Sequence, residues 1–114
     1  MTNVQNTKRG SFDLEQRTYN FARDVRLYAK TVKITSLNVD DIKQVIRSSG
    51  SIAANYIEAN EALSKKDFLM RVKIARKEAK ETILWLHLLE ATEELLQEAG
   101  ELKKILSAII EKSK

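Results

Sequence analysis

The chain contains no proline and only three glycines among its 114 residues, so very little in it interrupts a helix. Proline removes a backbone hydrogen bond from a helix, and glycine carries a conformational cost there. Ala, Leu, Lys and Glu are abundant instead, which is the composition of long helices. A chain of this length forms one domain. The sequence therefore predicts a single all-α domain.

Apolar residues at helical spacing divide the chain into four segments. After a disordered N-terminal tail over residues 1–10, we predict helices over residues 13–33, 39–62, 64–90 and 93–112. Residues suited to cap the helix starts are Ser11 or Asp13, Asn38, Ser64 and Thr92. Short connections make consecutive helices antiparallel neighbours. We expect an up-down-up-down four-helix bundle over residues 11–114, with the first and third helices diagonally opposite.

Several classes of function find no support in the residues. The chain has no cysteine, hence no disulfide framework and no thiolate site. His87 is the only histidine, and neither a metal-binding helix motif nor a phosphate-cradling glycine loop is present. The longest apolar run, 83–86, is far too short to cross a membrane, and the first residues lack the apolar segment of a signal peptide. We expect a non-enzymatic, cytoplasmic protein that has no cofactor and no membrane partner.

A polar stripe follows one side of the second helix. At 100° per residue, a single narrow sector holds Arg47, Ser51, Asn55 and Glu58. The opposite sector is apolar and contains Val45 and Ile52. Small residues flank the stripe and let another backbone approach closely. The stripe is therefore either a solvated outer face or a contact with a second chain.

The third helix is apolar on more than one side. Its core stripe holds Phe68, Val72, Ala79 and Leu86, and a second cluster, roughly 100–160° away, holds Met70, Ile74, Trp85 and Leu88. Trp85 either covers the end of the bundle or contacts another subunit, and the enrichment of Trp and Met at interfaces favours the subunit contact. The predicted interface of a homo-oligomer comprises Arg47, Ser51, Asn55, Glu58, Met70, Ile74, Trp85 and Leu88.

Positive charge is concentrated on the first and third helices. Residues 65–80 hold seven basic and two acidic residues, whereas 40–61 and 90–114 are each net acidic. One basic stripe comprises Arg23, Arg26, Lys30 and Lys33, and another comprises Lys66, Lys73, Lys77 and Lys80. Such stripes can neutralise the phosphates of RNA or DNA. Alternatively, they are solvated faces of a protein-interaction scaffold that binds no nucleic acid. No aromatic ladder accompanies the lysines, which argues against base stacking.

A set of short motifs carries a resemblance to a known family. The most specific is Arg47-Ser-Ser-Gly-Ser-Ile-Ala-Ala-Asn-Tyr-Ile-Glu58. The others are Phe12–Glu15 with Phe21-Ala22, Ser64–Phe68, Ala75–Ala79 with Glu81 and Trp85-Leu86, and Leu102–Ile110. Over about residues 12–111, the chain resembles the 23S rRNA intervening-sequence protein family, which is related to the accessory variability proteins of diversity-generating retroelements. The connection between the third and fourth helices is shorter here than is usual in the family.

This resemblance implies a homopentameric ring of four-helix bundles. The family has no agreed catalytic site to carry over. The retroelement relatives bind nucleic acid and a reverse transcriptase, so the implied partners are further copies of the chain, RNA or DNA, and a nucleic-acid enzyme. The motif residues of the second helix coincide with its polar stripe, although the resemblance does not say what the stripe contacts.

Overall fold

Four helices make up most of the structure, a computed structural model that describes the backbone of residues 3–114 and the side chains of residues 13–114. They are α1 (Asn3–Thr31), α2 (Val39–Asn60), α3 (Lys65–Leu88) and α4 (Glu93–Lys112). Residues 3–114 contain no strand. The predicted all-α class with four helices is therefore confirmed.

The helix boundaries differ from the prediction mainly at the N-terminus. α1 begins at Asn3 rather than at residue 13, so the backbone of residues 3–10, which we predicted as a tail, is helical. Asp13 lies inside this helix and does not cap it. Gly10 costs a helix interior about 1 kcal/mol, but without a proline nearby it does not end the helix. The first two residues of the predicted tail lie outside the described residues.

Two of the predicted capping residues cap as expected, and a third acts differently. The Ser64 hydroxyl accepts a hydrogen bond from the Asp67 backbone N–H at 3.1 Å, and the Thr92 hydroxyl accepts one from Leu95 N–H at 3.4 Å. Asn38 occupies the N-cap position of α2 without a side-chain capping bond. Its side-chain oxygen instead accepts a hydrogen bond from the Thr35 backbone N–H, and its side-chain nitrogen donates one to the Lys33 carbonyl. It therefore orders the α1–α2 connection.

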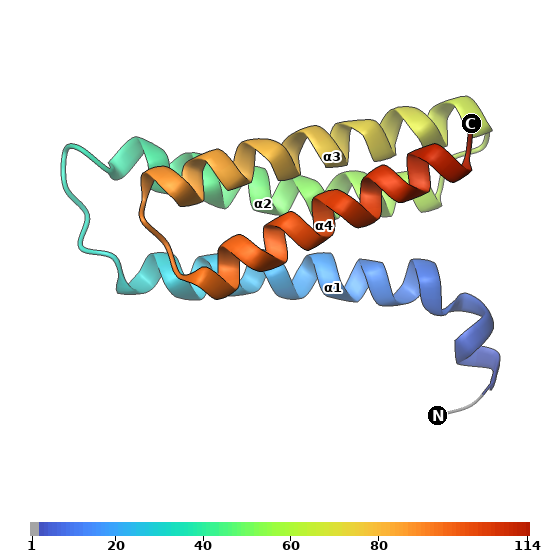
Figure 1. The fold of residues 1–114 in the computed structure, drawn as a ribbon, viewed down its shortest axis with the longest axis horizontal. Helices are drawn as coiled ribbons and strands as arrows, with labels where there is room; N and C mark the ends of the chain where they lie inside the picture. Colours follow the sequence, from blue (N-terminus) through green and yellow to red (C-terminus); the bar gives the residue numbers. More distant parts are fainter. Residues whose placement is uncertain (1–2) are drawn as a thin grey trace.

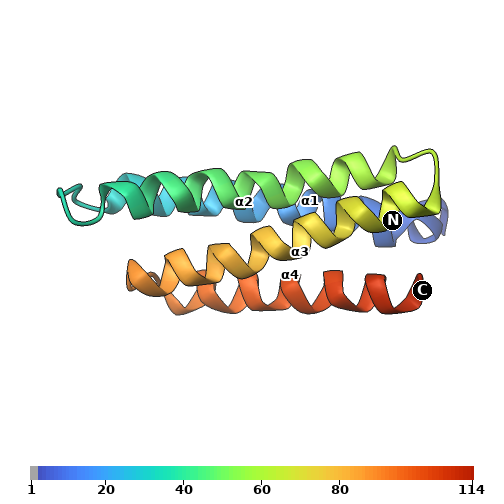
Figure 2. The ribbon, with the colours of Figure 1, turned by 90° about the horizontal axis from the view of Figure 1, so that it is seen from above.

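The helices pack in chain order around one core. The α1–α2 and α3–α4 connections lie at one end of the molecule and the α2–α3 connection at the other (Figure 1). Seen from above, α1 and α2 lie on one side and α4 on the other, with α3 between α2 and α4 (Figure 2). Within residues 3–114, α1 contacts α2 and α4, and α3 contacts the same two helices. As predicted, α1 and α3 lie diagonally opposite and do not contact each other within this part of the chain.

All four helices contribute to the core. Its largest buried side chains are Phe21, Val25, Val45, Ile52, Val72, Leu86, Leu102, Leu106 and Ile110. The predicted core stripe of α3 is confirmed by the burial of Val72, Ala79 and Leu86. In α4, Leu102, Leu106 and Ile110 are buried, whereas Ile109 is only partly buried.

The α3–α4 connection is a tight turn. Glu90 has a φ of 53°, in the left-handed region that costs a non-glycine residue roughly 1–2 kcal/mol. The Ala91 N–H donates to the Leu86 carbonyl at 3.0 Å, and the Glu90 N–H donates to the His87 carbonyl at 3.0 Å. These bonds satisfy carbonyls at the end of α3. They direct the chain straight into α4.

Replacing Leu102 by alanine tests the core. Leu102 is 0% exposed between the helices, whereas Leu63, in the α2–α3 connection, is 99% exposed. Leu102→Ala should lower the free energy of unfolding by about 2–5 kcal/mol because it leaves a cavity. Leu63→Ala, the matched control, should change it by less than about 0.5 kcal/mol. Urea denaturation followed by circular dichroism measures both values, and equal effects would contradict the placement of α4.

Candidate nucleic-acid interface

The polar stripe of α2 meets α3 of the same chain. The Arg47 guanidinium contacts the Glu78 carboxylate at 3.1 Å and the Glu81 carboxylate at 3.5 Å. The Asn55 side-chain oxygen accepts a hydrogen bond from Arg71 at 3.2 Å, and its amide donates to the carbonyl and hydroxyl of Ser51. The stripe therefore forms a polar seam between α2 and α3. The sequence had suggested only solvent or a second chain as its neighbour.

A buried hydroxyl pair lies next to this seam. The Ser48 and Thr82 hydroxyl oxygens are 2.7 Å apart, and both residues are 0% exposed. The Thr82 hydroxyl donates to the Glu78 backbone carbonyl at 2.7 Å. A hydroxyl has one hydrogen, so Ser48 is the donor to Thr82. Each hydroxyl group is satisfied, as buried polar groups must be.

An ion pair links the two helices that share the least extensive contact, α1 and α4. Arg17 donates to both carboxylate oxygens of Glu98, at 2.7 and 2.9 Å. This two-pronged geometry is the strong form of an arginine–carboxylate pair. The hydrogen bond to Glu98 raises the pKa of Arg17 above its ordinary value. The pair therefore adds a link between α1 and α4.

The eight basic residues predicted to bind phosphate are all exposed. Seven of them have no carboxylate within ion-pair distance among residues 13–114, namely Arg26, Lys30, Lys33, Lys66, Lys73, Lys77 and Lys80. The eighth, Arg23, lies 3.2 Å from its neighbour Asp24, and both side chains are about half exposed. Such an exposed pair contributes little. Both stripes thus present positive charge to solvent.

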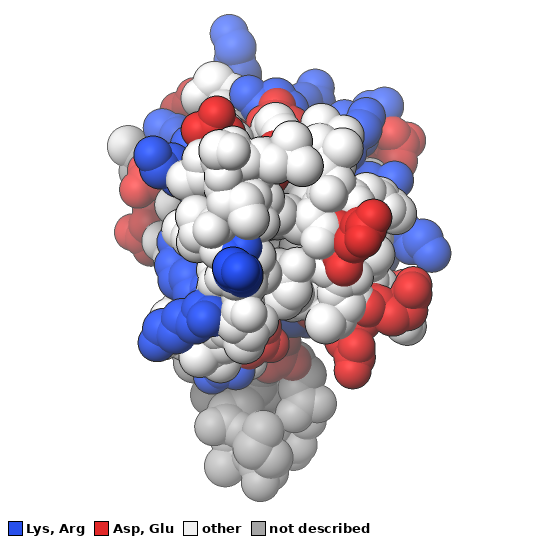
Figure 3. All heavy atoms as spheres, turned by 90° about the vertical axis from the view of Figure 1, so that its left-hand side faces the viewer, with Lys and Arg blue, Asp and Glu red and all other residues white. Residues whose placement is uncertain are grey.

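One chain does not unite the two stripes, because α1 and α3 have no contact within the described residues. Figure 3 looks at the end of the bundle that holds the α1–α2 connection. Lys and Arg atoms lie there mainly at the left and along the upper edge, and Asp and Glu atoms lie mainly at the lower right, with further acidic atoms among the basic ones at the upper left. This end of the molecule therefore carries both signs of charge.

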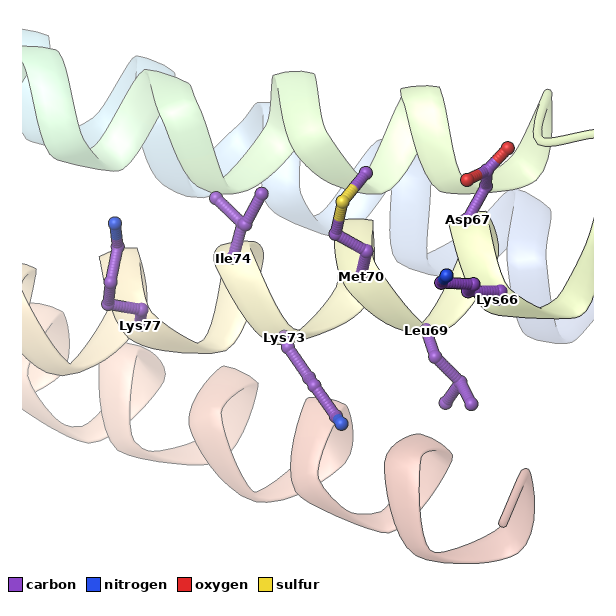
Figure 4. A pocket seen from close by; sticks show the side chains of 7 residues that line it. All are labelled: Lys66, Asp67, Leu69, Met70, Lys73, Ile74 and Lys77. Atoms are coloured by element: carbon purple, nitrogen blue, oxygen red, sulfur yellow. The ribbon is translucent and has the colours of Figure 1, made fainter.

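The outward face of α3 mixes cations with apolar groups. A hollow of about 550 Å³ is lined by α3 residues alone, among them Lys66, Met70, Lys73, Ile74 and Lys77. In Figure 4, Met70, Ile74 and Lys77 point towards the side where α2 lies, and Lys73 points towards α4. Because a single helix lines it, the hollow is a depression between side chains. It offers a surface and not an enclosed site.

The second apolar cluster of α3 divides into two parts. Leu88 is 56% exposed and forms an open apolar stripe with Leu84, which lies one turn earlier and is 49% exposed, whereas the 47% exposed Met70 lies apart from them among the lysines of α3. Trp85 is only partly exposed and packs against the core. Its indole N–H is buried and has no hydrogen-bond partner among the described residues. Within one chain, Trp85 therefore covers part of the core.

The sequence did not reveal the partners of the polar stripe. They are Arg71, Glu78 and Glu81 on α3. Their spacing contains a usable signal, since Arg71 and Glu78 are seven residues apart and lie on one face of a helix. Arg47 and Asn55, eight apart, also share a face. The packing of α2 against α3 pairs the arginine of each helix with an acceptor on the other.

The described residues offer no sign of metal or membrane chemistry. Residues 13–114 contain no group of three His, Cys, Asp or Glu side chains placed to hold a metal ion. His87 is exposed on α3. None of the helices in the described part of the chain is both long enough and apolar enough to cross a bilayer.

The fold and its surface define a small all-α protein with four helices and exposed cationic faces. A family model described as 23S rRNA-intervening sequence protein matches residues 11–113, and the chain belongs to this family. A solved structure of a protein of unknown function from the S23 ribosomal protein family of Bacteroides thetaiotaomicron is similar, with 31% identity and a TM-score of 0.76. The match covers 90% of this chain and 98% of that one. No curated protein sequence matches.

Removing Arg47 tests the seam. Its side chain is 50% exposed but pairs with Glu78, whose side chain is 8% exposed, whereas the 52% exposed Arg23 pairs with an open aspartate. Arg47→Met leaves a nearly buried carboxylate without its cation and should lower the free energy of unfolding by about 1–3 kcal/mol. Arg23→Met is the matched control and should cost less than about 0.5 kcal/mol. Thermal unfolding compares them, and equal stability of the two variants would refute a structural role for the seam.

Proposed function

We propose that this protein is a non-enzymatic, cytoplasmic accessory factor that binds RNA or DNA through the basic stripes of α1 and α3. The observation that supports it is the set of exposed cations without carboxylate partners. Two lysines outside the stripes are placed differently, because Lys104 lies 3.9 Å from Glu101 and Lys114 lies 2.9 Å from Glu111. Uncompensated Lys and Arg side chains raise the local positive potential and attract phosphates.

The proposal includes assembly of up-down-up-down bundles into a closed homo-oligomer, with five subunits as the family resemblance implies. Support comes from the apolar stripe of Leu84 and Leu88, which lies open near the C-terminal end of α3. A second copy covering these two leucines would remove apolar surface from water and leave the mixed face around Met70 uncovered. In a ring, the α3 stripe of one subunit then approaches the α1 stripe of its neighbour. Assembly thus supplies the continuous basic surface that a single chain lacks.

A protein partner is the second candidate, and the mixed face of α3 favours it. Met70 and Ile74 lie among Lys66, Lys73 and Lys77, so an acidic helix with an apolar side would complement this face. The nucleic-acid enzyme implied by the family's retroelement relatives is one such partner. Because this contact buries apolar groups as well as ion pairs, its binding should weaken less with salt than phosphate binding, which weakens steeply.

Charge reversal on α3 tests phosphate binding. The logarithm of the wild-type association constant should fall against the logarithm of salt concentration with a slope of roughly −0.9 per duplex phosphate contacted and −0.7 per single-strand phosphate. The double variant Lys73→Glu with Lys77→Glu should make this slope less negative, by the equivalent of about two phosphate contacts, on every sequence tested. Lys104→Glu with Lys112→Glu makes the same charge change on α4 and is the control. Fluorescence anisotropy measures the slopes, and equal effects of the two double variants would contradict the proposal.

Charge placed on the apolar stripe tests assembly. Light scattering of the wild type should give a mass near five subunits that persists at micromolar concentration. Leu88→Glu should shift the mass towards smaller species because it buries an unpaired carboxylate in the contact. Leu63→Glu adds the same charge at an almost fully exposed leucine and should leave the mass unchanged. A wild type that runs as a monomer would exclude the assembly.

A further inference from the structure

The groove between α1 and α2 combines an aromatic ring with two guanidinium groups. Its α1 side is lined by Tyr19, Ala22, Arg23 and Arg26, and its α2 side by Gly50, Ala53, Ala54 and Ile57. The groove has a volume of about 410 Å³, and ligand sites commonly measure roughly 300–1,000 Å³. Tyr19 is 57% exposed. It follows the same line along α1 as Arg23 and Arg26, at spacings of four and seven residues.

Arg26 is fixed over the floor of this groove by backbone groups alone. Its guanidinium donates to the Ala22 carbonyl at 3.0 Å and, across to α2, to the Ile46 carbonyl at 3.2 Å. Gly50 provides the space, because a Cβ atom there would lie only 3.1 Å from Arg26 Nη2. Neither bond neutralises the guanidinium charge, and no carboxylate in residues 13–114 pairs with it. The groove therefore holds a positioned, uncompensated cation.

The remaining lining residues suit a flat, weakly polar ligand that carries a negative charge. Ile57 is 44% exposed and forms an apolar wall with the alanines of α2. Arg23 can exchange its exposed Asp24 partner for a phosphate, since such pairs are weak. Unpaired nucleobases stack on tyrosine rings and on guanidinium planes. A duplex keeps its bases stacked inside and cannot offer one to the groove.

We propose that the α1–α2 groove takes an unpaired nucleobase of a single strand, which stacks on Tyr19 while its phosphates bind Arg23 and Arg26. This inference rests on the proposed binding of nucleic acid and specifies its class. The sequence argued against stacking because it shows no row of aromatic residues. One exposed ring beside positioned arginines is sufficient for one base. The groove thus makes the protein selective for single-stranded over duplex nucleic acid.

The experiment compares four fluorescein-labelled probes of equal length by anisotropy: single-stranded RNA, single-stranded DNA, duplex DNA and a DNA strand made entirely of abasic sites. Tyr19→Ala should weaken binding to both single strands about 5- to 10-fold, the effect of losing one stacked base, and leave duplex binding within about twofold. Tyr19→Phe should bind like the wild type. On the abasic strand, the wild type and Tyr19→Ala should bind equally. Gly50→Ala should reproduce part of the loss, and Gly100→Ala, where an added Cβ meets no atom within 4 Å, should not.

Each other outcome overturns a specific statement. If the wild type binds single strands and duplex equally and Tyr19→Ala changes neither, base stacking is wrong while phosphate binding stands. If the wild type binds none of the four probes, the proposed function itself fails. If Tyr19→Ala changes the oligomer mass in light scattering, the groove is a contact between copies of the chain. An RNA-only or DNA-only effect of Tyr19→Ala would contradict recognition of the base alone.

Discussion

The hydrogen bond between the buried hydroxyls of Ser48 and Thr82 fixes the position of α3 against α2, the most extensive helix contact in the molecule. Both side chains are small, so the two backbones approach closely at this point. A pair of larger apolar residues would push the helices apart, and Ser48 opposite an apolar side chain would lose its acceptor, at a cost of about 1–3 kcal/mol. Because a shift of either helix along the other would break this buried bond, the bond favours the observed register of α2 and α3. Arg47 with Glu78, and Asn55 with Arg71, then fall opposite one another along the seam.

The seam also determines the charge of the outer surface. α3 carries three acidic residues, and two of them, Glu78 and Glu81, turn towards Arg47 of α2. The third, Asp67, lies in the first turn, where a negative charge suits the helix dipole. None of the outward lysines of α3 lies within ion-pair distance of these three carboxylates. The outward surface of α3 is positive because Glu78 and Glu81 pair with Arg47 of α2 and not with the lysines of α3.

The elements that repeat regularly were predictable from the sequence. Periodic apolar residues located the four helices, and Ser64 and Thr92 marked two of their starts. The start of α1 was placed too late, because polar residues before Asp13 gave no apolar period although nothing there breaks a helix. The exposure of the basic stripes was also predictable, because charged residues lie opposite a core. The partners of Arg47 and Asn55 across the seam were not predictable, because the residue pattern of one helix does not give its register against the neighbouring helix. Nor was the groove, since it needs Gly50 and Arg26 from different helices.

Lysine footprinting tests most directly whether the basic stripes contact phosphate. The protein is labelled with an amine-reactive reagent, alone and with a saturating single-stranded oligonucleotide, and the labelled positions are read by mass spectrometry. Lys66, Lys73, Lys77 and Lys80 of α3, with Lys30 and Lys33, should lose reactivity, because phosphate contacts cover ammonium groups. Lys104 and Lys112 of α4 are exposed as well and provide the internal reference. Their reactivity should not change. Equal protection of α4 and α3, or protection of neither, would contradict the account.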